Sequence, residues 1–211
     1  MNNTLYIDNF TIWRESDTTP LPDTSFIPAM LRRRLTALEK IALSLAHHIA
    51  PTDRPYTTVF ASRYGEWEQT ARLISQFHTD HEMSPAGFSN SVHNAAPGHL
   101  SLLTKNKNSY TSIAAGARTL EMGLLTAFLQ PKPTLFIYAE ERTPDLYDSV
   151  FPHKIKSHGL ALFINDTATA TPILVSNATT TQTTPLSFDR VCDFLSQGTT
   201  ITANHWTITK Q

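Results

Sequence analysis

The sequence predicts a layered α/β domain. Segments with apolar residues at spacings of three and four alternate along the chain with short runs of β-branched and aromatic residues. Two of these runs, Thr134–Ala139 and Leu160–Ile164, are almost continuously apolar, as is typical of central strands covered on both faces. Ala114–Leu129 is apolar on most of its faces, which predicts a helix buried in the middle of a larger assembly. We therefore expect a single domain spanning residues 1–211.

Local signals define the elements of the N-terminal half. Leu5–Trp13 is rich in β-branched and aromatic residues around the turn-forming pair Asp8-Asn9, so we expect a short hairpin. Phe26–Ile49 carries one apolar stripe and ends before Pro51, which predicts an amphipathic helix. Three further elements are expected here: a strand at Thr57–Ala61, a helix at Glu66–Phe77, and a helix that starts at Ser84-Pro85 and is interrupted or kinked at Pro97-Gly98.

The C-terminal half gives weaker signals. A strand at Ser109–Ser112 precedes the buried helix, within which Arg118 and Glu121 are spaced to form an ion pair. The stretch Thr167–Thr184 is rich in threonine and is expected to form a loop or a β-ribbon. Three more elements are expected: a weak strand at Pro172–Val175, a short helix at Ser187–Leu195, and an edge strand near Trp206–Thr209.

Composition excludes several classes of protein. The net charge of -1 and the pI of about 6.7 argue against a nucleic-acid binder, which needs a basic stripe to neutralise phosphates. One cysteine allows no internal disulfide and no structural zinc pair. No apolar run approaches the roughly 20 residues of a membrane helix, and no secretory leader opens the chain. We expect a cytoplasmic protein without a membrane or nucleic-acid partner.

Motifs for metal or nucleotide chemistry are also missing. His78 and His81 flank Asp80, but the position of a further ligand holds Gln76, too few groups for a catalytic zinc. Seven glycines include no phosphate-binding loop. Cys192 lies in an apolar helix, where a free cysteine is usually a small core residue. We therefore expect no metal and no bound cofactor.

Two segments are more informative. Ser84–Leu102 (SPAGFSNSVHNAAPGHLSL) and Ser109–Leu125 (SYTSIAAGARTLEMGLL) resemble the N-terminal half of the β-ketoacyl synthases of the thiolase superfamily. Shorter blocks at Pro28–Leu35, Phe60–Gly65 and Leu135–Glu140 extend the resemblance over residues 5–165. The most similar family is the truncated, ketosynthase-like chain length factor of aryl-polyene-type polyketide clusters. The resemblance implies a layered α/β/α thiolase-like half-fold around a buried central helix.

The resemblance also implies an inactive protein. Synthases of this superfamily carry a cysteine nucleophile in a turn at the start of the buried helix, where the helix N-terminus favours the thiolate. Aligned on Gly116, the nucleophile position holds Ile113, and a shift of one residue would place Ser112 there. The family's two catalytic histidines belong to a C-terminal half that is expected to be missing, since the sequence ends at Gln211. We expect a non-catalytic subunit.

The same resemblance implies which surfaces of the protein contact its partners. A full-length β-ketoacyl synthase would pair with the strand formed by Asn108, Ser109, Tyr110 and Thr111. Phe88, Val92, His93 and Ala96 would form one helical face that closes the acyl tunnel and limits product length. The basic run Arg32, Arg33, Arg34 would dock an acidic acyl carrier protein, whose phosphopantetheine carries the substrates.

Two other functions remain open. A degenerate acyltransferase would use Ser112 as its nucleophile, although a serine without a general base is a poor one. A structural module would bind acyl chains or the carrier protein without controlling product length.

Overall fold

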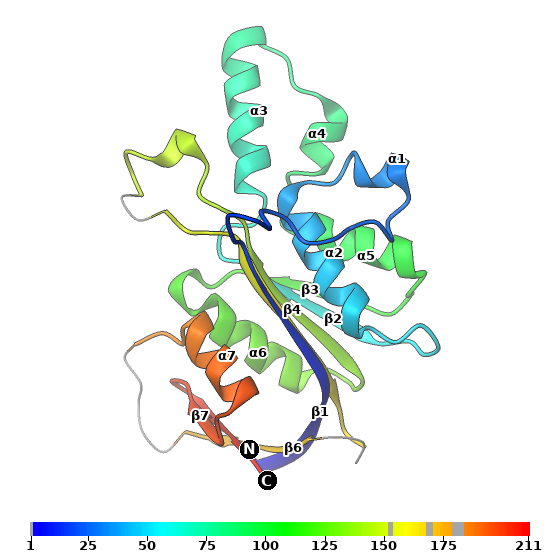
Figure 1. The fold of residues 1–211 in the computed structure, drawn as a ribbon, viewed down its shortest axis with the longest axis vertical. Coiled ribbons are helices and arrows are strands. Elements are labelled where there is room, and N and C mark those ends of the chain that lie inside the picture. Colours follow the sequence, from blue (N-terminus) through cyan, green and yellow to red (C-terminus); the bar gives the residue numbers. More distant parts are fainter. Residues whose placement is uncertain (1, 152–153, 168–170, 179–183) are drawn as a thin grey trace.

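The structure is a computed structural model that describes residues 2–151, 154–167, 171–178 and 184–211. These residues form one eight-stranded sheet in the order β3-β2-β4-β5-β1-β6-β8-β7 (Figure 1). β3, β2 and β4 are parallel, and the other neighbouring pairs are antiparallel. The strands are β1 (Asn2–Arg14), β2 (Thr57–Ala61), β3 (Tyr110–Ile113), β4 (Thr134–Glu140), β5 (His158–Asn165), β6 (Thr171–Asn177), β7 (Thr200–Thr202) and β8 (Trp206–Lys210).

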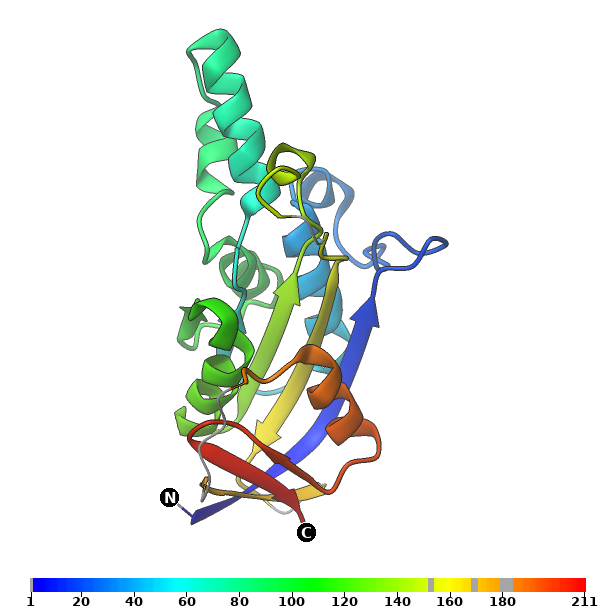
Figure 2. The ribbon, with the colours of Figure 1, turned by 90° about the vertical axis from the view of Figure 1, so that its left-hand side faces the viewer.

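Helices cover both faces of the central strands. α2 (Ala37–Ile49) and α5 (Ala95–Thr104) pack together on one face, α2 over β4 and β5 and α5 over β2 and β3. α6 (Thr119–Leu129) packs on the other face against β2 and β4, and α7 (Phe188–Ser196) contributes to the same core (Figures 1 and 2). The arrangement confirms the expected layered α/β/α fold.

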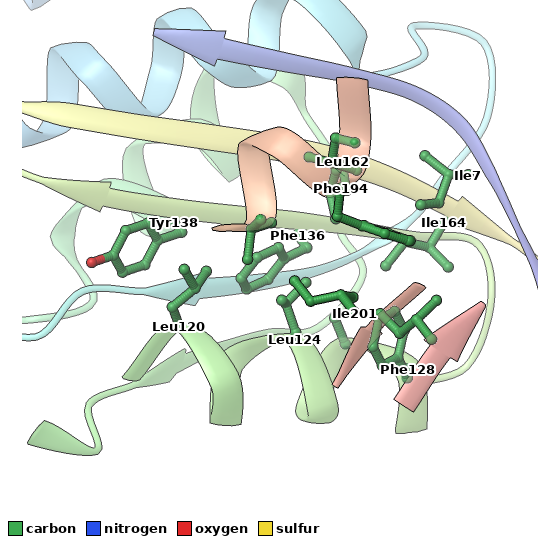
Figure 3. Packing of buried hydrophobic residues seen from close by; sticks show 14 of the residues in the cluster. Ile7, Leu120, Leu124, Phe128, Phe136, Tyr138, Leu162, Ile164, Phe194 and Ile201 are labelled. Carbon is green, nitrogen blue, oxygen red and sulfur yellow. The ribbon is translucent and has the colours of Figure 1, made fainter. Parts of the chain in front are cut away.

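The core beneath α6 is tightly packed. Leu120 and Leu124 point from α6 toward Phe136 of β4, and Phe194 of α7 closes the core beside Leu162 (Figure 3). Gly123 lies at the closest approach, because a Cβ there would be 2.7 Å from the Cβ of Ala61 and 2.9 Å from the Phe136 ring. The opposite side of α6 is less covered: Met122 and Leu125 are half-buried and Leu129 is exposed.

α3 (Trp67–Asp80) and α4 (Pro85–Ser89) project away from the sheet as an arm (Figure 2). An aromatic cluster anchors the base of the arm: Trp67 stacks on Tyr64 at 4.3 Å between ring centroids and lies edge-on to Phe151. The two arm helices pack where a Cβ on Gly87 would lie 3.2 Å from Leu73. Ile74 and Phe77 remain about half exposed along α3.

Two N-terminal expectations are wrong. Leu5–Trp13 is not a hairpin, because β1 runs straight through the Asp8-Asn9 pair with a bulge between Ile7 and Asn9. The first half of β1 pairs with β6 and the second half with β5, so both halves find partners far away in the sequence. The helix expected over Phe26–Ile49 is divided into α1 (Ala29–Arg32) and α2.

The division before α2 has a clear local cause. The Thr36 side chain accepts a hydrogen bond from the Glu39 backbone N–H (3.1 Å), and the Glu39 carboxylate accepts one from the Thr36 N–H (2.7 Å). This capping box satisfies free donors at a helix start, so the pattern Thr-x-x-Glu begins a new helix within the apolar stripe.

The other elements differ mainly in their limits. Pro97-Gly98 lies in the first turn of α5 and does not interrupt it. The helix expected over Ala114–Leu129 begins as a 3-10 turn, η1 (Gly116–Arg118), before α6. β8 is an internal strand between β6 and β7, so the edge strand expected at Trp206–Thr209 is wrong in position. The threonine-rich stretch contributes β6, while residues 168–170 and 179–183 lie outside the described residues.

Within the described part of the chain, no helix has the length and apolar character required to cross a bilayer.

We predict that Gly123→Ala lowers the free energy of unfolding by about 1–3 kcal/mol, because the added methyl group overpacks the contact with Ala61 and Phe136. Helix propensity alone predicts the opposite sign. Urea unfolding followed by circular dichroism measures the change. Leu129→Ala, at the exposed end of α6, is the control and should change stability little. A more stable Gly123→Ala protein would contradict the close approach.

Candidate functional site

The candidate site lies where the chain leaves β3, at the shared carboxyl end of the three parallel strands, the usual place for ligands in such sheets. Gly116 has φ +57 and open space around the position of a Cβ, so its left-handed backbone is what requires glycine. Thr119 closes the turn, since its hydroxyl donates to the Gly116 carbonyl (2.8 Å) and accepts from the Ala115 N–H (2.9 Å). Because α6 starts at Thr119, Ile113 does not directly precede an α-helix as the resemblance implied.

Neither candidate nucleophile position is hydrogen-bonded to a base among the residues that the structure describes. Ile113 is half-buried and packs against the core beneath α6. The Ser112 hydroxyl is buried and has no hydrogen-bond partner among the residues the structure describes. Activation of a serine needs a general base within hydrogen-bond reach. The described residues therefore assemble no nucleophile and base pair in this turn.

An ion pair fixes the start of α6, as the sequence spacing predicts. Arg118 Nη1 lies 2.8 Å from Glu121 Oε2, and the Glu121 side chain is fully buried. The other carboxylate oxygen accepts a hydrogen bond from the Asn204 backbone N–H at 3.1 Å. Glu121 thus ties the turn to the connection between β7 and β8.

β3 is an edge strand. The Ser109 carbonyl accepts a hydrogen bond from Thr58 of β2, and the Ile113 carbonyl accepts one from Ser62, directly after β2. Alternation along the strand directs the backbone N–H groups of Tyr110 and Ser112 to the other side. No described strand pairs with that side. Of the four residues assigned to a dimer strand, Tyr110 and Thr111 lie in β3, while Asn108 and Ser109 precede it. An exposed edge of this kind is a template for strand addition.

The expected tunnel-facing helix does not form as one face. Phe88 lies in α4, Val92 and His93 in the following turn, and Ala96 in α5. Phe88 is 57% exposed and Val92 40%, whereas Ala96 is 1% exposed and belongs to the core with α2. The helix breaks because the Ser89 and Ser91 hydroxyls donate to the nearby Pro85 and Phe88 carbonyls, while the backbone closes a turn at Asn90 and Ser91. A shared surface is therefore limited to Phe88 and Val92.

His93 has a structural contact instead. Its Nε2 lies 2.8 Å from the Ser62 carbonyl, and its ring tilts against Phe60. A Cβ on Gly65, which has φ +59, would lie 2.9 Å from the His93 ring. His93 thereby joins the turn before α5 to the loop that follows β2.

The basic run does not form a helical stripe. α1 ends at Arg32, whose guanidinium donates to the Thr24 carbonyl (3.3 Å). Arg33 and Arg34 are exposed in the turn after α1. The Asn90 side chain donates to the Arg34 carbonyl (3.0 Å), so this turn is held against the base of the arm.

A comparison with known families identifies the kind of domain that contains the turn after β3. The family model described as β-ketoacyl synthase, N-terminal domain, matches residues 9–207, nearly the whole chain. The chain belongs to this family.

Solved structures agree with the fold of this ketosynthase-like domain. A structure entitled as a ketosynthase (ApeO) in complex with its chain length factor (ApeC) from Xenorhabdus doucetiae matches with a TM-score of 0.78 at 20% identity, covering 98% of this chain and 99% of that chain. The ishigamide ketosynthase/chain length factor matches with a TM-score of 0.58 at 14% identity, covering 83% and 66%. No curated protein matches the sequence. At these identities the structures establish the thiolase-like fold.

The ketosynthase-like domain also holds a cluster of buried carboxyl groups that the sequence analysis missed. Glu140 ends β4 and accepts hydrogen bonds from the Ser62 hydroxyl (3.2 Å) and the Arg63 N–H. Glu141 accepts one from the Glu68 N–H (2.9 Å), in the first turn of α3. Two acidic residues directly after a continuous apolar strand were the available signal. They fasten the base of the arm to the sheet.

Burial dominates the chemistry of this cluster. It raises the pKa of Glu140 and of Glu141 to about 7, although hydrogen-bond donors oppose the shift. Burial, with the charges of Glu39 and Glu141 nearby, raises the pKa of Glu66 to about 9. Glu39 also lies 2.7 Å from His99 Nδ1, and this contact raises the pKa of His99. Across the described residues, no three potential ligand side chains are placed to hold a metal ion.

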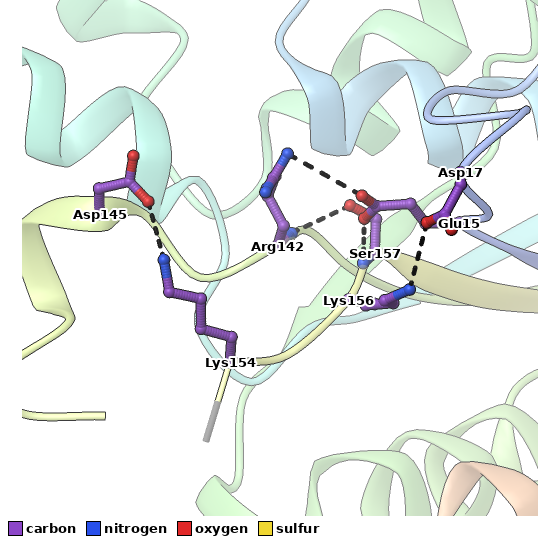
Figure 4. Close-up of polar contacts among 7 residues, drawn as sticks. All are labelled: Glu15, Asp17, Arg142, Asp145, Lys154, Lys156 and Ser157. Carbon is purple, nitrogen blue, oxygen red and sulfur yellow. Dashed lines mark hydrogen bonds and ion pairs between the residues drawn. The ribbon is translucent and has the colours of Figure 1, made fainter. Parts of the chain in front are cut away.

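Polar contacts on the neighbouring loop reinforce the same end of the sheet (Figure 4). The Glu15 carboxylate accepts a hydrogen bond from the Ser157 N–H (2.7 Å), and the Ser157 hydroxyl accepts one from the Arg142 N–H (3.0 Å). Exposed ion pairs join Lys154 to Asp145 (3.0 Å) and Lys156 to Asp17 (3.7 Å). The ends of β1 and β4 are thus tied to the start of β5.

We predict that the free energy of unfolding falls by several kcal/mol as pH rises from about 5 to about 8, on the order of 2 kcal/mol for each buried carboxyl group that titrates. Glu140 and Glu141 have pKa values near 7 when folded and an ordinary value of 4.5, so the folded state binds more protons in this window. Raising the pH therefore favours the unfolded state. Urea titrations at a series of pH values measure the slope.

Glu141→Gln is the matched variant. It keeps an oxygen that accepts from the Glu68 N–H but removes one titrating group, so its stability should depend less on pH. Comparing the two proteins also cancels the contribution of His158 to the pH dependence. Burial lowers the pKa of His158, so below pH 6.5 its contribution to stability changes with pH in the opposite direction. Identical slopes for both proteins would contradict the assignment.

Proposed function

We propose that this ketosynthase-like domain is a non-catalytic chain length factor. It pairs with an active β-ketoacyl synthase and helps to set the length of a polyketide, of the aryl-polyene type. The observation that carries the proposal is the turn after β3, which keeps its left-handed glycine but holds Ile113 and a Ser112 hydroxyl without a base. Loss of a catalytic nucleophile typically removes about six orders of magnitude in rate.

The similar structures support this role. The titles of two matching structures name a ketosynthase together with a chain length factor, in one case as a complex, and that structure matches almost the full length of both chains. A third is entitled as a type II acyl carrier protein in complex with its ketosynthase. A carrier protein is accordingly the partner that would bring acyl and malonyl thioesters to the complex on its phosphopantetheine, with no cofactor bound by this chain.

Features of the surface support pairing. β3 offers backbone N–H groups on its free side, and Leu129 on α6 and Phe88 on the arm leave apolar area uncovered. Both kinds of surface are stabilised when a partner covers them. Arg33 and Arg34 are exposed and would attract an acidic carrier protein.

We predict that Ser112→Pro weakens binding to the partner synthase at least about tenfold. Proline removes an N–H on the free side of β3 and leaves the neighbouring contacts to β2, so strand addition is blocked. Co-purification and analytical ultracentrifugation of the pair measure the effect. Ser112→Ala keeps the N–H and is the matched control; it should bind normally.

The same variants test the acyltransferase alternative. The chain alone, incubated with acyl and malonyl carrier proteins, should form no condensed or transferred product. Ser112→Ala should leave the activity of the heterodimer unchanged. Turnover by the chain alone that is lost in Ser112→Ala would overturn the non-catalytic assignment.

We predict that Val92→Trp and Phe88→Trp shift the product distribution of the heterodimer toward shorter chains. Both side chains are substantially exposed, so a larger ring should not disturb the fold of this chain. The ring would instead occupy part of the acyl tunnel that this surface closes in the partner synthase. Mass spectrometry of the products measures the shift. Leu102→Trp, on the exposed side of α5, is the control. An unchanged distribution in a competent complex contradicts the tunnel assignment and favours a purely structural module.

A further inference from the structure

A separate cavity of about 700 Å³ opens at the amino end of the parallel strands. It is lined by residues of α2 and α5, by the loop 50–56 and by the turn 105–108. Its volume is in the range of small-molecule sites. Asn108 is on its rim, whereas the turn after Ile113 is at the other end of β3, about 16 Å away along the strand. The cavity is therefore distinct from the candidate site.

The floor of the cavity is apolar. Leu43, Ala46 and Leu100 are buried core residues of α2 and α5 that line it, and Leu103 is half-buried beside them. On one side Phe26 stacks in parallel on His47 at 3.7 Å between ring centroids, which gives a flat wall. Such a surface accepts an alkyl chain.

The rim carries an excess of positive charge. Lys105, Lys107 and Arg54 line the cavity together with a single carboxylate among the lining residues, Asp53. Arg54 is paired with Asp8, but Lys105 and Lys107 are exposed and have no ion pair within the part of the chain that the structure describes. The nearby C-terminal ends of α2 and α5 add about half a negative charge each, so the positive charge that a ligand would meet is concentrated at Lys105 and Lys107. This excess stands out in a chain of net charge -1.

The turn that carries the two lysines is held in place. Lys105 has a left-handed backbone (φ 56) that ends α5. The Asn106 side chain donates to the Tyr56 carbonyl (2.7 Å), and the Ser101 hydroxyl donates to the Asn106 carbonyl (2.6 Å). The positions of both lysine backbones are therefore fixed before any ligand binds, which lowers the entropic cost of binding.

We propose that this cavity binds an amphipathic anion, a medium-chain aliphatic carboxylate, with its alkyl chain on the α2–α5 floor and its carboxylate at Lys105 and Lys107. An apolar pocket with a few charged groups at its mouth matches such a molecule in both parts. The binding does not depend on pairing with a ketosynthase, so it stands or fails separately from the proposed function.

Calorimetric titration of the full chain with dodecanoate tests the proposal. We expect saturable binding of one molecule per chain with a Kd below about 100 µM. Lys105→Ala/Lys107→Ala should weaken binding at least about tenfold, whereas Lys154→Ala/Lys156→Ala, which removes the same charge elsewhere, should not. Dodecyltrimethylammonium tests whether the head group must be negatively charged, and butanoate tests whether a medium-length alkyl chain is needed. Both should bind at least about tenfold more weakly than dodecanoate.

Methyl NMR locates the site, because dodecanoate should shift the signals of Leu43, Leu100 and Leu103 first. Absence of saturable binding up to about 1 mM, equal affinity in the two lysine double variants, or equal affinity for the cationic probe would each overturn the proposal. Shifts confined to residues outside the cavity would also overturn it.

Discussion

The complete burial of β4 governs the rest of the structure. All seven residues of this strand are buried, so both of its faces need a covering layer. α2 covers one face and α6 the other, and α6 approaches so closely that a Cβ on Gly123 would lie 2.9 Å from the Phe136 ring. Charged groups are absent from Thr134–Ala139 and gather where β4 ends, at Glu140 and the following Glu141. The layers, the helix contact and the buried carboxyl groups are consequences of one strand with no exposed face.

The turn after β3 shows that the residues that build the frame of the candidate site are distinct from the position of a reactive group. The turn after β3 keeps the features that position a reactive group: a parallel strand, a left-handed glycine and a helix locked by the Arg118–Glu121 pair. Ile113, one of the two candidate positions for the reactive group, packs against the core instead. The frame would persist without catalysis because its residues also stabilise the domain.

The sequence predicted the buried elements well and the positions of breaks poorly. β2, β4, β5 and α7 follow from short apolar runs and helical spacing, which report burial directly. The hairpin expected in β1 fails because pairing with β5 and β6, far away along the chain, overrides a local Asp-Asn turn signal. The split between α4 and α5 rests on local serine hydrogen bonds and a backbone turn within an otherwise helical pattern. The carboxyl cluster and the cavity depend on three-dimensional proximity, which no local pattern carries.

The two-sided pairing of β1 has a consequence for the order of folding. Its residues pair with β5 and β6, so the centre of the sheet joins residues 2–14 to residues 158–177. Contacts of such sequence separation are slow to form, because a long loop must close first. During synthesis the first strand would therefore wait, unpaired at that position, until most of the chain has left the ribosome. β2, β3 and β4 are contained within residues 57–140, so they would assemble earlier and present the edge to which β5 and then β1 add.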